Sequence, residues 1–182
     1  MDAEHLFWTT SRAAGIVVLL ASSAAVTLGL LIGGRMAKGR GAQLRTAHEA
    51  LSLATIAALV VHAGALLGDG YISPNLADVT IPFWSDYATV WTSTGIVAGW
   101  LFVVLGLSYY ARARIGVARW RRLHRFTALA WLMGVVHGLM EGTDAGTAWF
   151  LVTAAAVVLP AFGLLAARLA RTSQAAVPAV PR

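Results

Sequence analysis

The chain has 182 residues, of which 58% are hydrophobic and only 12% are charged, and it contains no cysteine. This composition is typical of a membrane protein that forms one compact bundle, and the lack of cysteine excludes disulfides, iron–sulfur clusters, thiolate-bound zinc and haem attached through a CxxCH motif. The net charge of +6 would suit a nucleic-acid partner, but the basic residues follow a pattern that indicates membrane topology instead.

Five apolar segments follow one another along the chain, each close to the ~20 residues that a membrane-spanning helix needs. We expect them at residues 11–33, 46–68, 90–110, 123–141 and 147–168. Small residues are frequent in them, as expected where membrane helices pack closely, and Pro160 is expected to kink or loosen the last segment. The sequence predicts an all-α integral membrane bundle of about five transmembrane helices. It forms one domain, residues 1–170, followed by a short cytoplasmic tail, 171–182, expected to be disordered.

The charged residues predict the orientation of the bundle. Thirteen of the 14 basic residues fall on one side of the expected topology, with Arg12 as the exception, and seven of the eight acidic residues fall on the other side. The positive-inside rule then places the N-terminus outside and the C-terminus inside. The N-terminus does not resemble a cleaved signal peptide. We therefore expect a multi-pass protein of a bacterial-type plasma (inner) membrane, in contact with lipid and without a nucleic-acid partner.

Four of the five histidines lie in two of the apolar segments. His48 and His62 are 14 residues apart in the second segment, and His124 and His137 are 13 residues apart in the fourth. Ionisable residues inside membrane spans are costly and indicate function. At ~1.5 Å per residue each spacing covers roughly 20 Å, about two-thirds of a ~30 Å hydrocarbon core. Because both segments run from inside to outside, we expect His48 to face His124 near the inner surface and His62 to face His137 near the outer surface.

Two facing imidazoles are suitable axial ligands for one haem iron, so this pattern predicts two non-covalently bound b haems. His48 and His124 would hold the inner iron, and His62 and His137 the outer one. The alternatives are four separate structural histidines, or a bare metal site for which Glu49 is the only nearby carboxylate. In an ideal helix, 13 residues leave two side chains about 140° apart. We therefore also expect a distortion in the fourth segment, for which Gly134 is the candidate position.

Other residues are candidates for supporting roles, each with a simpler alternative. Arg45, Arg121 and Arg125 could neutralise the propionates of an inner haem or could only set the topology. Arg12 could pair with an outer propionate, position an acceptor, or be an interfacial arginine. Trp131 could fill the gap between two haems or simply pack in the core. The aromatic residues of the outer connection, 69–89, could form an interfacial belt or a cap over the outer cofactor.

The segment WRRLHRFTALAWLMGVVHGLMEGTDAG, residues 120–146, and the two histidine pairs with one segment between them resemble the ferric-reductase-like transmembrane domain superfamily. That superfamily includes NADPH oxidases, metalloreductases and the haem subunit of bacterial periplasmic methionine sulfoxide reductase. The resemblance covers about residues 11–168. It implies two b haems and electron transfer across the membrane, and it carries over the axial-ligand role to His48, His62, His124 and His137.

The chain departs from that superfamily in two respects. Such domains usually have six spans, whereas five are expected here, and no flavin- or nicotinamide-binding domain follows the last segment. The resemblance therefore implies the haem-bearing membrane component of an oxidoreductase. Its electrons would come from a separate flavoprotein, a flavin bound at the inner face, or membrane quinol, and would pass to an outer-face acceptor. A cytochrome b561-like quinol oxidoreductase, which usually spreads its four ligands over four helices, and a non-redox membrane scaffold are the alternative functions.

Overall fold

The computed structural model describes residues 3–36, 39–70 and 72–175. In these residues the chain forms eight helices and no strand. The helices are α1 (Ala3–Gly33), α2 (Gly41–Leu66), α3 (Leu76–Thr80), α4 (Thr89–Leu107), α5 (Arg112–Ile115), α6 (Val117–His124), α7 (Thr127–Met140) and α8 (Ala148–Ala175). The expected all-α fold is confirmed.

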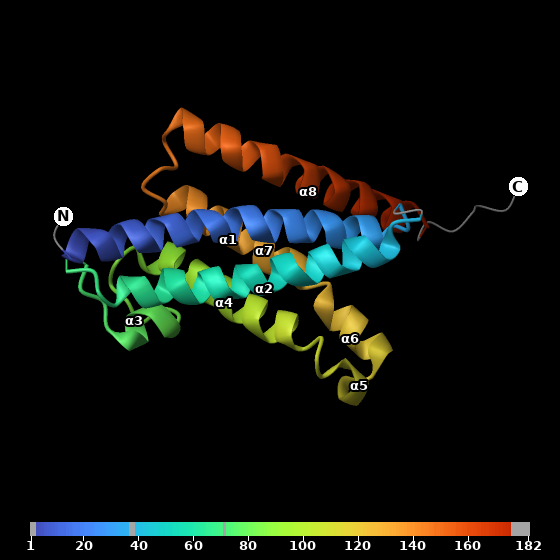
Figure 1. The fold of residues 1–182 in the computed structure, drawn as a ribbon, viewed down its shortest axis with the longest axis horizontal. Coiled ribbons are helices and arrows are strands. Elements are labelled where there is room, and N and C mark those ends of the chain that lie inside the picture. Colours follow the sequence, from blue (N-terminus) through green and yellow to red (C-terminus); the bar gives the residue numbers. More distant parts are fainter. Residues whose placement is uncertain (1–2, 37–38, 71, 176–182) are drawn as a thin grey trace, which may run out of the picture.

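The long helices are arranged as a bundle around α1. Helices α1 and α2 lie antiparallel, side by side, and share the most extensive interface of the fold (Figure 1). The second interface joins α4 to α7, and α7 also contacts α1, which connects the two pairs. Helix α8 packs against α1 on the side opposite α2 (Figure 1). The start of α1 and the end of α8 lie at opposite ends of the bundle (Figure 1).

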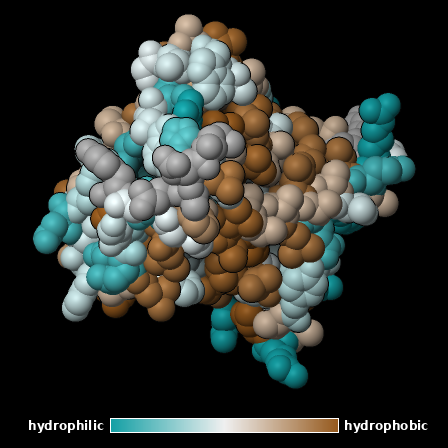
Figure 2. Space-filling view, turned by 60° about the vertical axis from the view of Figure 1, so that its left-hand side comes forward, coloured by the Kyte–Doolittle hydropathy of each residue, from teal (hydrophilic) through white to brown (hydrophobic). Residues whose placement is uncertain are grey.

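The outside of the bundle is apolar, as the surface of a membrane protein must be. Four helical stretches in the described residues are long and apolar enough to cross a membrane: His5–Gly33, Gly41–Leu66, Thr89–Leu107 and Ala148–Arg171. Large apolar side chains on them face outwards, for example Val60, Val152 and Leu159, which are 64%, 70% and 65% exposed. Figure 2 shows hydrophobic residues in the middle of one face and hydrophilic residues near its edges. Such an extended apolar surface is suited to contact with lipid.

The fourth expected span differs from the other four. The sequence predicts one helix over 123–141, but the structure divides this region into α6, which ends at His124, and α7, which begins at Thr127. With 14 residues, α7 is about 21 Å long, shorter than a ~30 Å hydrocarbon core. The expected count of five full-length spans is therefore not confirmed, because the fourth is broken next to its first histidine.

The interior is built mainly from small residues, which let the helices approach closely. Ala98, Ala130 and Ala161 are almost completely buried. The largest fully buried side chain in the described residues is that of Trp131, which is 1% exposed. Its Nε1–H donates a hydrogen bond to the equally buried Ser23 hydroxyl, 2.9 Å away. A buried indole needs such a partner for its N–H. This contact joins α7 to α1 at the centre of the bundle.

Two further expectations concern the connections and the tail. The outer connection contains the short helix α3, which begins with a capping box formed by Asn75 and Asp78, an arrangement that satisfies free N–H groups at a helix start. The aromatic side chains of Phe83 and Trp84, which follow α3 in the same connection, are mostly exposed.

Helix α8 continues through Pro160 and ends at Ala175, so the first residues of the expected disordered tail are helical. The rest of that tail, 176–182, lies outside the described residues.

Candidate functional site

The structure brings the four histidines together in the two expected pairs. The ring centres of His48 on α2 and His124 at the end of α6 are 6.2 Å apart, with their planes at 82°. The ring centres of His62 on α2 and His137 on α7 are 6.3 Å apart, with their planes at 73°. All four side chains are partly buried. One pair lies near each end of α2, and both pairs join α2 to the same chain segment, α6–α7.

These distances fit two imidazoles on opposite sides of one metal ion. A bond of about 2 Å from each nitrogen to the metal puts the two ring centres roughly 6 Å apart, since each centre lies about 1 Å behind its nitrogen. The steep angle between the planes is compatible with this arrangement, because each ring can turn about its own bond to the metal. No group of three or more histidine, aspartate or glutamate side chains in the described residues could hold a bare ion. Haem needs only two protein ligands, since its porphyrin supplies four nitrogens.

Hydrogen bonds that the rings donate to backbone carbonyl oxygens orient three of the four imidazoles. The carbonyl oxygens of Ala25 and Ser11 on α1 lie 2.8 Å from Nδ1 of His48 and of His62, respectively. The carbonyl oxygen of Trp91 on α4 lies 3.0 Å from Nδ1 of His137. A carbonyl only accepts, so each Nδ1 carries a proton, and in the neutral imidazole the other ring nitrogen, Nε2, is then the unprotonated one. An unprotonated Nε2 is the form of imidazole that ligates a metal, and a second partner on Nδ1 is the usual support for such a ligand.

The fourth ring, His124, is held differently. Trp120 stacks on it with ring centres 5.0 Å apart and planes at 29°, and its Nε1–H donates to the Ser108 hydroxyl 3.1 Å away. Nδ1 of His124 is buried without a partner of hydrogen-bonding geometry in the described part of the chain. The Leu105 backbone at the end of α4 interacts with this ring. His124 is thus positioned mainly by aromatic stacking.

A carboxylate accompanies the pair His62–His137. Glu141, one helical turn after His137, places Oε2 3.1 Å from Nδ1 of His137. Its other oxygen, Oε1, accepts a hydrogen bond of 2.8 Å from the Thr92 hydroxyl on α4. The carboxylate is therefore fixed between α4 and α7 beside the imidazole. This feature distinguishes the pair His62–His137 from the pair His48–His124.

The break between α6 and α7 explains how His124 and His137, which are 13 residues apart, can both face α2. The N–H groups of Phe126 and Ala128 donate to the carbonyls of Leu123 and Arg125, each three residues earlier. Such bonds are those of a 3₁₀-helix, which turns ~120° per residue instead of ~100°. The extra rotation brings His137 towards the face of His124. The expected distortion exists, but its expected position at Gly134 is wrong, because α7 continues through that residue.

The structure gives Arg12 a protein partner. Its Nε and one terminal nitrogen donate to the two carboxylate oxygens of Asp144, in the connection between α7 and α8. The guanidinium also lies 5.1 Å from the centre of the Trp8 ring. Arg12 therefore ties the start of α1 to the connection between α7 and α8, and its side chain is 36% exposed.

Three basic residues near the end of the bundle opposite Arg12 have exposed side chains. The side chains of Arg45, Arg121 and Arg125 form no hydrogen bond or ion pair within the described residues. They lie close to His48 and His124 in sequence, so they stay candidates for contact with an anionic group beside that pair.

The carboxylate of Glu49 accepts a 2.9 Å hydrogen bond from the Tyr110 hydroxyl, which raises the pKa of Tyr110 because the phenolate could not donate it.

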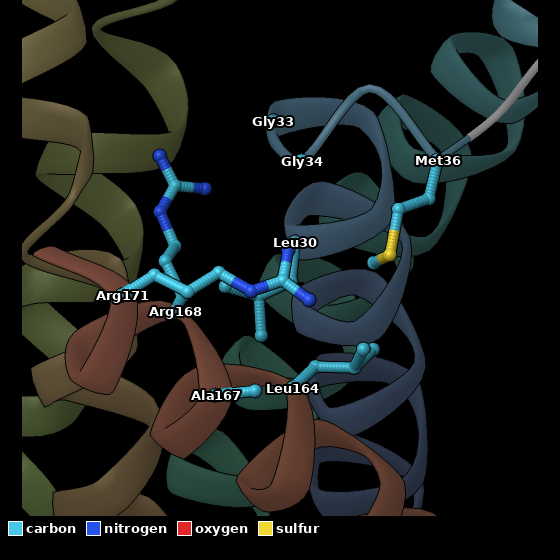
Figure 3. Close-up of a pocket in the computed structure, with 8 residues that line it drawn as sticks. All are labelled: Leu30, Gly33, Gly34, Met36, Leu164, Ala167, Arg168 and Arg171. Carbon is cyan, nitrogen blue, oxygen red and sulfur yellow. The ribbon is translucent and has the colours of Figure 1, made fainter.

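A cavity of about 210 Å³ lies at the same end, between the last turn of α1 and α8 (Figure 3). Leu30 and Leu164 form part of its apolar wall, and Arg168 and Arg171 contribute the charged groups. The guanidinium of Arg168 lies close to the backbone of Gly33 at the C-terminus of α1, where a cation is favourable. No histidine lines this cavity, so it is separate from the two pairs.

The sequence did not predict several residues of the site. Trp120, Glu141, Thr92 and Ser11 all support the pairs, and only the helical spacing of four residues could have pointed to the first two, since i and i+4 side chains share a helix face. Ser11 and Thr92 contact the site from other helices, which no local pattern reveals. Comparisons with protein families, curated proteins and solved structures find no match for this chain.

Proposed function

We propose that this chain is the haem-bearing membrane component of an oxidoreductase and that it conducts electrons across a membrane. His48 and His124 would be the axial ligands of an inner b haem, and His62 and His137 those of an outer one. The observation that supports this proposal most directly is the separation of the ring centres, 6.2 Å and 6.3 Å. The same separation in both pairs is what a repeated bis-histidine site requires and what unrelated structural histidines would have no reason to share.

The chain's own residues supply orientation and exclusion of water. The backbone bonds to Nδ1 keep three imidazoles in the tautomer that leaves Nε2 available. The buried pair Trp131 and Ser23 fills the interior between α1 and α7 and keeps water from the bundle centre. A haem held in this way supplies one-electron chemistry between ferric and ferrous iron. Arg45, Arg121 and Arg125 would neutralise propionates or attract an anionic donor at the inner face.

We further propose five passes through a bacterial-type inner membrane, with α7 as the short fourth pass and the N-terminus outside. The basic end would then face the cytoplasm. Electrons would enter there from a separate flavoprotein, a bound flavin or a quinol, and leave at the acidic outer face to an acceptor. Both pairs join the same two chain segments, α2 and α6–α7, which favours this function over a cytochrome b561-like arrangement with ligands on four helices.

The visible spectrum of the detergent-purified protein tests the proposal. We expect a low-spin b-type spectrum that changes on reduction with dithionite, and about two haems per chain by pyridine haemochrome. Single His48→Ala and His137→Ala variants should each keep about one haem. His5→Ala is the matched control and should keep both haems, because His5 stacks on Trp8 at the start of α1 and belongs to neither pair.

Protein without haem, purified from haem-replete cells, would contradict the proposal and favour a membrane scaffold. A haem content that single histidine variants leave unchanged would contradict the assigned ligands. In both cases the paired histidines would be structural contacts between α2 and the α6–α7 segment.

A further inference from the structure

The three backbone oxygens that orient histidines share one feature of sequence. Each belongs to the residue four positions before a glycine. On α1, the Ser11 carbonyl accepts from His62 and lies four residues before Gly15. The Ala25 carbonyl accepts from His48 and lies four residues before Gly29. On α4, Trp91 holds His137 and precedes Gly95. The same relation occurs at three sites on two helices.

Helix geometry explains the relation. In an α-helix every Cβ is tilted towards the N-terminus, so the side chain at position i+4 covers the carbonyl of residue i. Glycine leaves that carbonyl open to a second donor, in addition to the N–H that it already accepts within the helix. A Cβ built on Gly95 would lie 2.6 Å from Nδ1 of His137. One on Gly15 would lie 3.1 Å from Nδ1 of His62, and one on Gly29 would lie 3.1 Å from Cε1 of His48.

The fourth histidine shows when such a glycine is not needed. His124 faces the Leu105 backbone at the end of α4, and the residue four positions later is Tyr109. The last carbonyls of a helix have no N–H partner within it, and the Leu105 carbonyl accepts instead from the Ser108 hydroxyl at 2.6 Å. At this site the helix has ended, and no side chain at i+4 covers the carbonyl in the helical manner.

We infer that Gly15, Gly29 and Gly95 are positioning residues for the paired histidines. Each provides a notch in a neighbouring helix where an imidazole ring sits and where the uncovered carbonyl fixes its tautomer and its direction. The inference rests on the proposed function, because it assigns these glycines to the holding of axial ligands. Added methyl groups would push the rings out of the notches and away from their partners across the pair.

Alanine variants of the glycines test the inference, with haem content and the electron paramagnetic resonance of the ferric protein as readouts. Gly95→Ala has the tightest contact and should lower the content from about two haems to about one. In a His48→Ala background the same change should remove the remaining haem. Gly29→Ala should keep both haems but alter the resonance signal that His48→Ala abolishes, because its contact is looser.

Two controls separate notch loss from general helix packing. Gly106→Ala, on the same helix as Gly95, would create a contact as tight as that of Gly29, 3.1 Å, but with the Ile56 side chain. Gly163→Ala in α8 would meet nothing within 4 Å. Both should keep two haems with unchanged resonance signals. Size-exclusion profile and helical circular dichroism report folding, and if Gly95→Ala does not fold, Gly15→Ala and Gly29→Ala carry the test through their resonance signals.

Unchanged haem content and resonance in all three notch variants would overturn the inference while leaving the proposed function intact. Equal losses in the Gly106→Ala control would also overturn it, because the effect would then be one of helix packing. A wild-type protein without haem is a different result, since it would overturn the proposed function and with it the role assigned to the notches.

Discussion

At the scale of single residues, the carboxylate of Glu141 distinguishes the pair His62–His137 from the pair His48–His124. It lies 3.1 Å from Nδ1 of His137 and is fixed by Thr92. A carboxylate beside Nδ1–H makes an imidazole a stronger donor to its metal, which favours the ferric state and lowers the reduction potential. Each outer-pair histidine also has a backbone acceptor for its Nδ1–H, whereas His124 of the inner pair has none of good geometry among the described residues.

This difference gives a prediction about potentials. Glu141→Gln keeps the shape but removes the charge, and it should raise the midpoint potential of the proposed haem between His62 and His137 by on the order of tens of millivolts. Glu49→Gln is the control, since Glu49 contacts the exposed Tyr110 instead of an imidazole. A spectroscopic redox titration measures both variants. A potential that is unchanged in Glu141→Gln, or a shift confined to the inner haem, would show that this carboxylate does not tune its neighbour.

At the scale of helices, the pair Arg12–Asp144 joins α1 to the connection between α7 and α8. The Asp144 side chain is only 7% exposed, so loss of its charge leaves a guanidinium without its bidentate partner. Asp144→Asn should cost about 1–2 kcal/mol of stability, less than a fully buried pair would, because the Arg12 side chain is partly in water.

A double-mutant cycle checks this prediction. The variants are Arg12→Ala, Asp144→Asn and the two combined, and thermal unfolding in detergent is the measurement. The double variant should lose less stability than the sum of the two single losses, because either one already breaks the contact. Additive losses would show that the two side chains do not stabilise each other.

Hydropathy predicted the helices better than their ends and their breaks. Four of the five expected spans are long helices, because a run of about 20 apolar residues determines a span with little help from its neighbours. The break after His124 was not located, since it depends on the packing of His124, Trp120 and the end of α4. The facing of the histidines could be predicted from depth and direction alone. The notch glycines could not, because their role appears only once a ring from another helix lies against them.

At the scale of the whole molecule, the distribution of basic residues predicts an orientation in the membrane. Because the sequence has no cysteine, labelling of single introduced cysteines can measure this orientation. Asp86 is exposed in the outer connection, and Gln43 is exposed at the start of α2 at the basic end. Each can be changed to a single cysteine in a background that has none. The positive-inside rule predicts that a membrane-impermeant maleimide labels Asp86→Cys in intact spheroplasts. It should label Gln43→Cys only after the membrane is permeabilised, and the reverse pattern would invert the proposed direction of electron flow.

The matched spacings of α1 and α2 limit how this protein can change in evolution. The notches Gly15 and Gly29 are 14 residues apart, as are His48 and His62. A deletion between the two histidines would turn one ring by about 100° and leave the notch of α1 empty, so an insertion or deletion in either helix would require a compensating one in the other. Between α4 and the α6–α7 segment, the backbone groups that face the histidines, Trp91 and Leu105, are again 14 residues apart, but His124 and His137 are 13 residues apart. There the break after His124 supplies part of the rotation of the missing residue, so we expect the α6–α7 segment to accommodate a change of length more readily than α2.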